Sequence, residues 1–235
     1  MTRRPYGLIC PISLACEILE PRWTIQILTE IWNGSTRFND IRKGLGNIST
    51  ATLSRRLKEM EASGLVERIE DKAAGTVDYF RTEKAIKLEP AMHALAEWAL
   101  CNIEADIALN GADASTIMWV VRRMIDLTEL PRRRAVIRFH FRDDPPPKCP
   151  NCWFVVEPGA DFPELCWLDP GRDVDLYVET GVVSLGAIIE GHSSIEREKE
   201  RGRLFLSGDP GLARSMDRWL RTSVYAGLEG IAQLS

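Results

Sequence analysis

A short stretch of this 235-residue chain, from Asn47 to Val66, carries the side chains best suited to a binding role. Leu53, Leu57 and Met60 recur at i, i+4 and i+7, which is the spacing of one buried helix face. The opposite face is small, hydroxyl-bearing and positively charged, and consists of Ser49, Thr50, Ala51, Thr52, Ser54, Arg55 and Lys58. Such a face fits the major groove of double-stranded DNA. Most basic amphipathic helices are only solvated, so the neighbouring elements decide between the two interpretations.

Cysteine residues form a second group that could carry chemistry. Cys149 and Cys152 have the spacing of half a zinc site, because two thiolates three residues apart can bind one tetrahedral ion. A structural site needs four ligands, and the obvious supplements, Cys166 and His140, both fall in strand patterns. We therefore expect neither a metal nor a cofactor, and we interpret the pair as a hairpin turn with a reducible thiol pair.

Two further positions allow reactive chemistry. Cys10 precedes a predicted helix, whose aligned amides favour a thiolate, although a small apolar residue at a domain edge is the plainer interpretation. Ser193 follows His192, but no glycine frames it as a nucleophile elbow, and the spacing reveals no supporting acid or base. We expect no catalytic residues and predict that the protein is not an enzyme.

The composition is that of a soluble globular protein, with 45% hydrophobic and 27% charged residues. No apolar run approaches the roughly 20 residues that span a bilayer, and the N-terminus lacks the apolar core of a secretory signal. We therefore expect a cytoplasmic protein with no membrane partner, and free thiols at its six cysteines. The net charge is −4, yet residues 37–58 contain six basic residues and one acidic residue, which indicates a nucleic-acid footprint that includes Arg37.

The elements that must position the basic face are mostly helical. Apolar spacing and helix-breaking residues predict four helices, at 11–19, 23–32, 36 to about 46, and 49–64. Ser49 is a natural N-cap for the fourth helix, and Gly64 is a natural stop.

A small hairpin follows these helices. Two β-rich runs, 65–69 and 77–81, flank a polar turn at 70–76 that ends in glycine. Helices followed by such a hairpin make a winged helix-turn-helix, in which Lys72 at the wing tip reaches the sugar-phosphate backbone.

A series of motifs occurs along this half with nearly constant spacing: Cys10-Pro11, Arg22-Trp23-Thr24, Ile27-Leu28, Arg37 to Ile41, Ile48-Ser49, Leu53, Arg56-Leu57, Gly64 to Val66 and Val77 to Tyr79. Over about residues 8–100 this series resembles the HxlR-type winged-helix transcription regulators. The chain departs from that pattern at Thr50, where proline is frequent, and at 73–75, where the wing is often proline-rich. The resemblance implies a dimer that binds operator DNA near the genes it controls, and some relatives sense oxidants through a cysteine at the position of Cys10.

A long helix is predicted from Thr82 to about Leu109. One apolar stripe, which includes Leu88 and Met92, can seal the winged domain. The second stripe contains Ala96, Leu100, Ile103 and Ile107. It fits either the core of the same chain or a dimer seam, and the resemblance favours the seam because this helix commonly pairs between subunits in the family.

The second half, beyond a linker at 111–115, changes character. A helix through Ile117 to Met124 precedes a strictly alternating strand at 135–142. More strands are predicted at 152–157, 165–168, 174–179 and 203–207, and helices at 183–200 and 210–220. The fold class is therefore multidomain: a mainly α winged helix-turn-helix domain at 1–110, and at 111–235 an α+β domain with a mainly antiparallel sheet.

The motifs Leu168 to Gly171, Asp173 to Leu176, Leu185 to Gly191, Gly208 to Pro210 and Arg218 to Leu220 resemble a sterol-carrier-protein-like domain that is appended to some HxlR regulators. The resemblance implies an apolar tunnel for a hydrophobic ligand. The residues predicted to line it are bulky and apolar, and any one of them fits a plain core equally well: Phe139, Phe141, Trp153, Trp167, Leu176, Ile188 and Trp219.

These patterns favour a dimeric transcriptional regulator, most simply a repressor, that binds operator DNA and responds to a hydrophobic small molecule in its second domain. Two alternatives remain open: a thiol-based redox-sensing repressor that uses Cys10, and a lipid carrier or enzyme with a vestigial winged-helix domain. The groove-facing cations at Arg55 and Lys58 argue against the last, because a simple tether needs none.

Overall fold

The computed structural model describes residues 6–143 and 145–234, so the first five residues of the N-terminal stretch examined for a signal lie outside the described residues. The chain divides after Met92 into two compact units, residues 1–92 and residues 93–235, each of which is described by itself. Among the described residues, no helix combines the length and the apolar character that a bilayer span requires.

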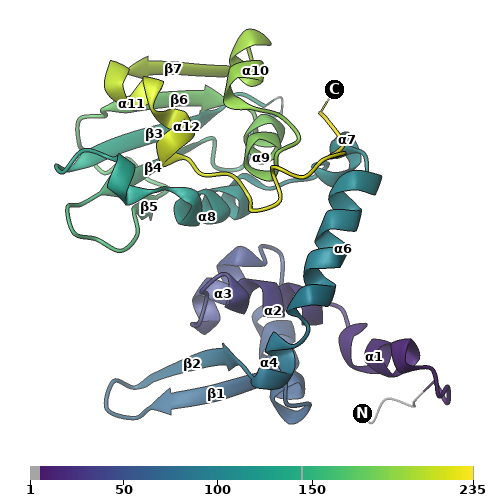
Figure 1. Ribbon diagram of the computed structural model, residues 1–235. Helices are drawn as coiled ribbons and strands as arrows, with labels where there is room; N and C mark the ends of the chain where they lie inside the picture. Colours follow the sequence, from purple (N-terminus) through teal and green to yellow (C-terminus); the bar gives the residue numbers. More distant parts are fainter. Residues whose placement is uncertain (1–5, 144, 235) are drawn as a thin grey trace. The chain divides into compact units, whose positions relative to one another are not determined.

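The first unit contains helices and one hairpin (Figure 1). Its elements are α1 (Pro11–Leu19), α2 (Thr24–Trp32), α3 (Phe38–Gly44), α4 (Thr50–Ala62), β1 (Val66–Asp71), β2 (Thr76–Arg81) and α5 (Glu83–Ile86), followed by the start of α6 (Glu89–Asn102). The four helices and the two strands predicted over 11–81 are confirmed. Gly64, the predicted stop of α4, has a φ of 71°, which glycine adopts without steric cost.

The core of this unit forms where the apolar faces of α2, α3 and α4 meet. Its buried members include Ile27, Leu28, Ile31, Ile41, Ile48, Leu53, Leu57, Met60, Leu65 and Val66. Gly44, at the end of α3, allows a close approach, since a Cβ there would lie 1.9 Å from the Glu30 carboxylate. Glu30 is itself buried and accepts a hydrogen bond from the Ser35 hydroxyl at 3.0 Å.

The long helix predicted from Thr82 to Leu109 is wrong, because the segment consists of α5, α6 and α7 (Ala105–Ala108). Pro90 has no N–H to donate to the carbonyl of Ile86, so α5 cannot continue into α6. The side-chain amide of Asn102 donates to the carbonyl of Trp98 at 2.8 Å where α6 ends. The division between the units falls within α6 rather than at residue 110, because the backbone amide of Ala232 donates to the carbonyl of Leu100 at 3.0 Å and thereby joins α6 to the C-terminal tail.

The second unit is built on a five-stranded sheet with the order β5-β4-β3-β6-β7. Three neighbouring strand pairs are antiparallel, and β3 and β6 are parallel. The strands are β3 (Ala135–Phe141), β4 (Asn151–Val156), β5 (Glu164–Cys166), β6 (Leu176–Thr180) and β7 (Leu204–Gly208). The other elements are α8 (Ala114–Met124), η1 (Leu127–Glu129), α9 (Val182–Glu190), α10 (Ile195–Glu200), α11 (Pro210–Arg214) and α12 (Met216–Trp219).

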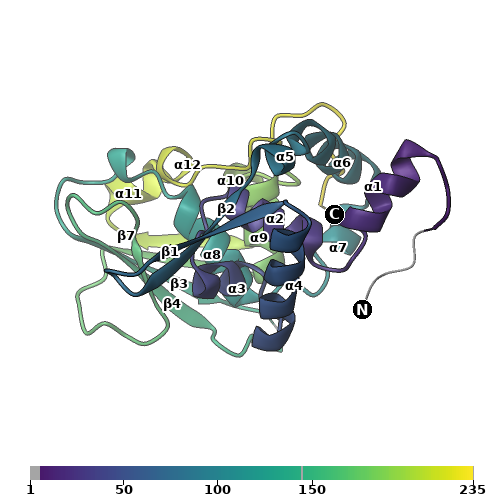
Figure 2. The same ribbon diagram turned by 90° about the horizontal axis from the view of Figure 1, so that it is seen from below.

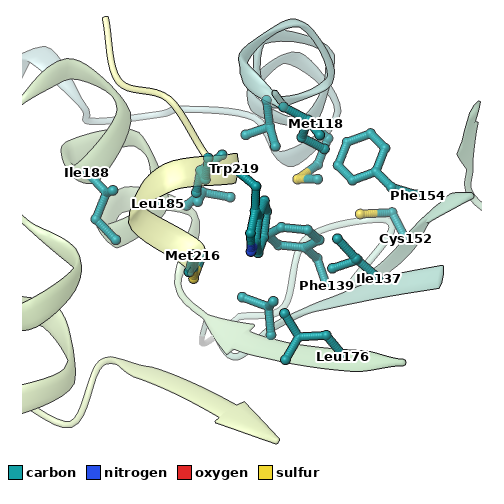
Figure 3. Packing of buried hydrophobic residues seen from close by; sticks show 14 of the residues in the cluster. Met118, Ile137, Phe139, Cys152, Phe154, Leu176, Leu185, Ile188, Met216 and Trp219 are labelled. Carbon is teal, nitrogen blue, oxygen red and sulfur yellow. The ribbon is translucent and has the colours of Figure 1, made fainter. Parts of the chain in front are cut away.

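One face of the sheet packs against α8, α9 and α12 (Figure 3). Strand β3 alternates as predicted, with Ile137, Phe139 and Phe141 fully buried on this face. Phe139 meets Phe154 of β4 edge to face, with ring centroids 5.8 Å apart. Trp219 belongs to the same core (Figure 3) and donates its indole N–H to the carbonyl of Leu212 at 2.9 Å, so the polar atom of this buried aromatic side chain is satisfied.

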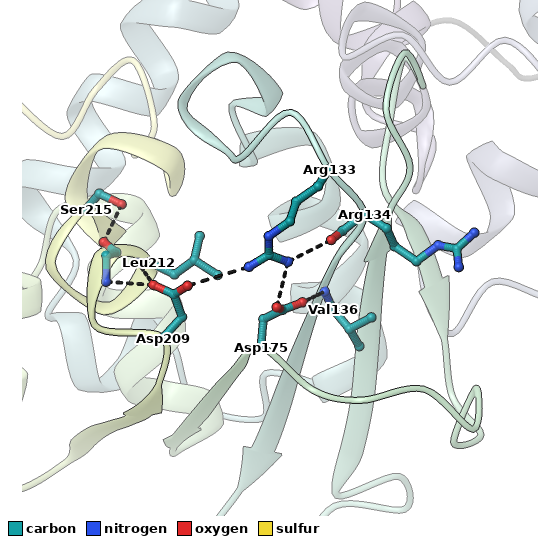
Figure 4. Close-up of polar contacts among 8 residues, drawn as sticks. Arg133, Arg134, Val136, Asp175, Asp209, Leu212 and Ser215 are labelled. Carbon is teal, nitrogen blue, oxygen red and sulfur yellow. Dashed lines mark hydrogen bonds and ion pairs between the residues drawn. The ribbon is translucent and has the colours of Figure 1, made fainter.

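Arg133 links three segments at one end of the sheet (Figure 4). Its guanidinium contacts Asp175 at 2.7 Å and Asp209 at 3.6 Å. Asp175 also accepts the backbone amide of Val136 at 2.8 Å, and Asp209 caps α11 through the amides of Gly211 and Leu212. These contacts set the ends of β3 and β6 and the start of α11.

The two helices predicted at 183–200 and 210–220 are each broken in the structure. Gly191 ends α9 with a φ of 86°, and a Cβ there would lie 2.6 Å from the Cα of Ala226. Ser194 then starts α10 as a new N-cap. Ser215 separates α11 from α12 and donates its hydroxyl to the carbonyl of Gly211 at 3.0 Å.

Candidate functional site

Helix α4 is seen from the side in Figure 2. Its residues divide into a buried stripe and an exposed face on the opposite side. Leu53, Leu57 and Met60 are buried, as predicted. On the other face Ser49, Thr50, Ala51, Arg55 and Lys58 are exposed, and Thr52 and Ser54 are half-buried. The helix therefore presents the predicted set of small, hydroxyl-bearing and cationic side chains together.

Capping fixes the start of this helix. The hydroxyl of Ser49 accepts the backbone amide of Thr52 at 3.1 Å and donates to the Thr52 hydroxyl at 2.8 Å, so Ser49 is the predicted N-cap. The first turn of α4 contains no acidic residue, and its positive helix end is not offset by a nearby carboxylate. The dipole of this 13-residue helix and the lack of a nearby carboxylate both favour binding of an anion next to its N-terminus.

The cations of α4 differ in whether an acidic residue pairs with them. The guanidinium of Arg56 forms an ion pair with Glu59 one turn away. Arg55 and Lys58 have no ion-pair partner anywhere in the described part of the chain. These two cations are therefore available to phosphate.

Arg42 belongs to this face, although the sequence analysis counted it only as part of the basic patch. It lies in the last turn of α3, is exposed, and donates from Nη1 to the Thr50 hydroxyl at 3.3 Å. The signal that could have identified it is its position in a helix C-terminal turn a few residues before the N-cap of α4.

Arg37 occupies a different position. Its Nε lies 2.7 Å from Asp78 of β2, and Thr36 donates to the same carboxylate at 2.8 Å. These contacts connect the start of α3 to the wing. A phosphate would have to compete with Asp78 for Arg37, so this residue is better placed to support the wing than to bind DNA.

Lys72 lies in the turn between β1 and β2, as predicted. Asp71 accepts the backbone amides of Ala73 and Ala74 at 2.9 and 3.0 Å, which fixes the turn. Lys72 is exposed and makes no ion pair with any other described residue. The wing thus carries one uncompensated cation at its tip.

The HxlR-like helix-turn-helix family profile matches residues 18–107. Over 93 residues the chain is 37% identical to the helix-turn-helix transcriptional regulator YvaP of Bacillus subtilis, an alignment that covers 39% of this chain and 86% of YvaP. This chain belongs to the HxlR-like helix-turn-helix family.

Two further proteins are similar to this part of the chain. The regulator sll1512 of Synechocystis is 32% identical over 97 residues, which cover 39% of this chain and 72% of sll1512. A solved structure of reduced YodB from B. subtilis is 31% identical, covers 41% of this chain and 97% of YodB, and has a TM-score of 0.37. The protein is thus a transcriptional regulator of the HxlR type, and DNA binding follows from membership of a helix-turn-helix regulator family.

The stripe predicted as an HxlR-type dimer seam is only partly exposed. Ala96, Leu100 and Ile103 are half-buried, and Ile107 is exposed. The large apolar side chains that α6 leaves exposed are instead Leu95 and Trp98, at 56% and 61%.

Six of the seven side chains predicted to line an apolar tunnel belong to the core of the second unit or pack against it. Trp153 is buried on the opposite face of the sheet, where the guanidinium of Arg138 lies over its ring. Phe139, Phe141, Trp153, Leu176, Ile188 and Trp219 are buried, and Trp167 is half-buried against the core. Alternation along the strands points most of them into the space between sheet and helices, where they pack against one another. Of the seven, only Ile188 lines a cavity found among α9, α10, α12 and the C-terminal tail.

This cavity has a volume of about 350 Å³. It lies among the end of α9, α10, α12 and the C-terminal tail, and is lined by Ile188, Gly191, Ser193, Ser194, Ile195, Glu196, Arg197, Asp217, Leu220, Thr222, Ala226 and Gln233. Its size is at the lower end of the range for small-molecule pockets. Sequence patterns missed it because its walls are helix ends and an irregular segment.

Buried acids support the wall of this cavity. The Ser193 hydroxyl donates to Glu198 at 2.5 Å, and Arg203 lies 2.9 Å from the same carboxylate. Burial acts to raise the pKa of Glu198, but the hydrogen bonds from Ser193 and Ser184 and the charge of Arg203 outweigh it and lower that pKa. The pKa of Glu190 is raised because burial outweighs its hydrogen bond with Ser223. Ser193 thus holds the Glu198 carboxylate in place.

All six cysteines are free thiols. The pKa of exposed Cys10 is lowered, chiefly by the amides of Ser13 and Ile12 at the start of α1. Burial, with a smaller contribution from Cys149, raises the pKa of Cys152 and disfavours its thiolate. In the described residues no cluster of three or more histidine, cysteine or acidic side chains is arranged to hold a metal ion.

Proposed function

We propose that this HxlR-type regulator binds operator DNA as a homodimer, most simply as a repressor, with α4 in the major groove and Lys72 beside it. The observation that carries the proposal is the pair of uncompensated cations, Arg55 and Lys58, on the face opposite to the buried stripe of α4. Arg42 extends this face across the turn between α3 and α4. The first unit then supplies both direct readout and phosphate contacts.

The homodimer rests on exposed apolar side chains. Ile9 and Ile12 at the start of α1 are 97% and 74% exposed, and Leu95 and Trp98 form an exposed stripe on α6. Apolar side chains this prominent favour a subunit interface. We therefore place the seam on Leu95, Trp98 and Ile107 rather than on the half-buried residues Ala96, Leu100 and Ile103.

Selection from random double-stranded DNA tests the dimeric function. A symmetric dimer should enrich an inverted repeat whose half-sites lie about 10–11 base pairs apart, because two recognition helices enter successive turns of the same groove face. Enrichment of single, unrepeated sites would contradict the dimer, and absence of any enriched sequence would contradict operator binding.

We propose further that residues 111–235 form a sterol-carrier-like domain that binds a small effector with apolar character. Support comes from a cavity with a buried apolar floor and from a second unit that a simple repressor does not need. An effector changes operator affinity only if it favours one arrangement of the two DNA-binding units over another. Operator titration of the full chain, with and without a lipid extract of the source cells, should therefore show a shift of roughly 5–150-fold.

A second candidate function is thiol sensing at Cys10. The favouring observation is an exposed thiol whose pKa is lowered by the first amides of α1. Peroxide should then change operator affinity of the wild type but not of Cys10→Ser, while Cys101→Ser, another exposed cysteine, behaves as the wild type. An equal response of all three proteins would exclude Cys10.

A further inference from the structure

The cavity in the second unit has a divided lining. Its floor is apolar, since Ile188, Ile195 and Leu220 are buried side chains. The remaining wall is polar and includes the hydroxyls of Ser194 and Thr222 and the side chain of Gln233. A ligand that matches this lining has an apolar body and one polar end.

The charged groups at the cavity decide the nature of that end. Arg197 also lines the cavity, and its guanidinium donates from Nη1 to the neutral side-chain oxygen of Gln233, so it keeps its positive charge against the two acids of the lining. Within the described residues, neither Glu196 nor Asp217 makes an ion pair or a side-chain hydrogen bond. The cavity therefore offers two carboxylates that no described cation pairs with, one from α10 and one from α12, beside an apolar floor.

We propose that this cavity binds a small amphiphilic amine. The apolar body lies on Ile188, Ile195 and Leu220, and the protonated nitrogen faces Glu196 and Asp217. A charged amine gains charge-assisted hydrogen bonds from these carboxylates, which a neutral hydroxyl does not match. A fatty acid or phosphate head group would meet like charges and is disfavoured.

The tail that closes the cavity connects it to α6 within the same unit. Ala226 and Gln233 of the tail line the cavity. Three residues before Ala226, the backbone amide of Ser223 donates to the carbonyl of Ile189 at 2.7 Å and holds the start of the tail to α9. Farther along, Ala232 donates to Leu100 of α6 at 3.0 Å. A ligand that orders the tail thereby stabilises its contact with the helix that continues into the DNA-binding unit. Only this effect on DNA rests on the function proposed above.

Three probes with one body test the ligand class by calorimetry on the full-length protein: 4-phenylbutylamine, 4-phenylbutanol and 4-phenylbutanoate. At pH 7 the amine should bind about tenfold or more tightly than the alcohol, and the carboxylate should bind most weakly. Equal affinities of amine and alcohol, tighter binding of the carboxylate, or no binding of the amine would overturn the proposal.

Variants locate the binding. Glu196→Gln with Asp217→Asn should lower the affinity for the amine by about tenfold, so that the amine and the alcohol bind equally well. Thr222→Trp fills the cavity from an exposed position and should abolish binding of all three probes. The control pair Glu200→Gln with Asp173→Asn removes the same charge outside the cavity and should change nothing. Amine binding that survives Thr222→Trp, or that weakens equally in the control, would contradict this site.

DNA titration in the presence of 4-phenylbutylamine separates the site from the regulatory role. Amine binding with unchanged operator affinity would overturn the coupling through the tail and leave the site intact. A response to lipid extract that persists in Thr222→Trp would overturn this cavity as the effector site and leave an effector-controlled regulator in place.

Discussion

The two units of this regulator differ in how their functional groups relate to regular structure. In the winged-helix unit most of the side chains proposed to contact DNA lie on one face of α4, and its other face belongs to the core. In the C-terminal unit the regular strands and helices are devoted to the core, while the cavity lies among helix ends and a tail without helix or strand. Periodicity therefore reveals a binding face in the first unit and only a core in the second.

The sharpest test of this contrast is Trp219→Ala. Trp219, the last residue of α12, is fully buried, and its indole N–H donates a hydrogen bond to the carbonyl of Leu212. If Trp219 is a core residue, its truncation to alanine should lower the free energy of unfolding by about 3–5 kcal/mol, measured by urea denaturation with circular dichroism. The control Trp98→Ala removes an exposed indole and should cost far less. If Trp219→Ala lowers the free energy of unfolding by less than about 1 kcal/mol, the core role is contradicted and a position in the wall of a tunnel is favoured.

A smaller effect is expected from Glu198→Gln. The substitution removes the negative charge that faces Arg203 and leaves one acceptor oxygen for the two hydroxyls of Ser193 and Ser184, which should destabilise the second unit by about 2–4 kcal/mol. Because the folded pKa of Glu198 is lowered, its stabilisation is complete above its unfolded pKa of about 4.3 and is lost as the pH falls through the lower folded value. The difference between wild type and variant should therefore shrink in acid. A difference that is constant from pH 7 to pH 3 would show that the charge contributes nothing.

Assembly tests the exposed apolar stripe of α6 in the second unit. Leu95→Glu with Trp98→Glu places two charges in the proposed seam and should weaken the dimer by about 2–3 kcal/mol, which sedimentation equilibrium reports as a shift toward monomer. Leu168→Glu with Val224→Glu alters two equally prominent apolar side chains of the same unit and serves as the control. If the Leu95→Glu with Trp98→Glu variant dimerises as well as the control variant, α6 does not lie in the interface.

The smallest effect is expected at the start of α4. Ser49→Ala removes the N-cap hydrogen bond and should cost about 1 kcal/mol of stability in the first unit. Ser54→Ala should lower the stability by less, because Ser54 lies on the same face but does not cap the helix. Hydrogen exchange at the first turn of α4 would report the difference, and equal exchange rates in both variants would contradict a capping role.

Much of the winged-helix unit was predictable because its determinants are local. The spacing of Leu53, Leu57 and Met60, the cap at Ser49 and the stop at Gly64 all lie within one helix. Arg42 was missed because its contact with Thr50 joins two helices, which no single-helix pattern reveals. The ion pair of Arg37 was not predictable for the same reason, since its partner Asp78 is 41 residues away in the chain.

The second unit shows where sequence patterns fail. Alternation correctly placed Ile137, Phe139 and Phe141 on one face of β3, but a core and a tunnel wall need the same alternation. The helix breaks at Pro90 and Gly191 were visible as residue types and were passed over. The position of the tail against Leu100 depends on a contact more than 130 residues apart in sequence, so the exposed side of α6 could not be assigned in advance.

The most direct test of the central claim is the salt dependence of DNA binding by the full-length protein with Arg55→Ala and Lys58→Ala combined. If both cations contact phosphates, the slope of log affinity against log salt should decrease in magnitude by about 2, with a loss of roughly 10–100-fold at 0.15 M salt. Lys199→Ala with Arg214→Ala removes the same charge from the C-terminal unit and should leave the slope unchanged. Fluorescence anisotropy with a selected operator fragment at several salt concentrations gives both quantities. A slope and affinity equal to those of the wild type would contradict the assignment of DNA binding to the exposed face of α4.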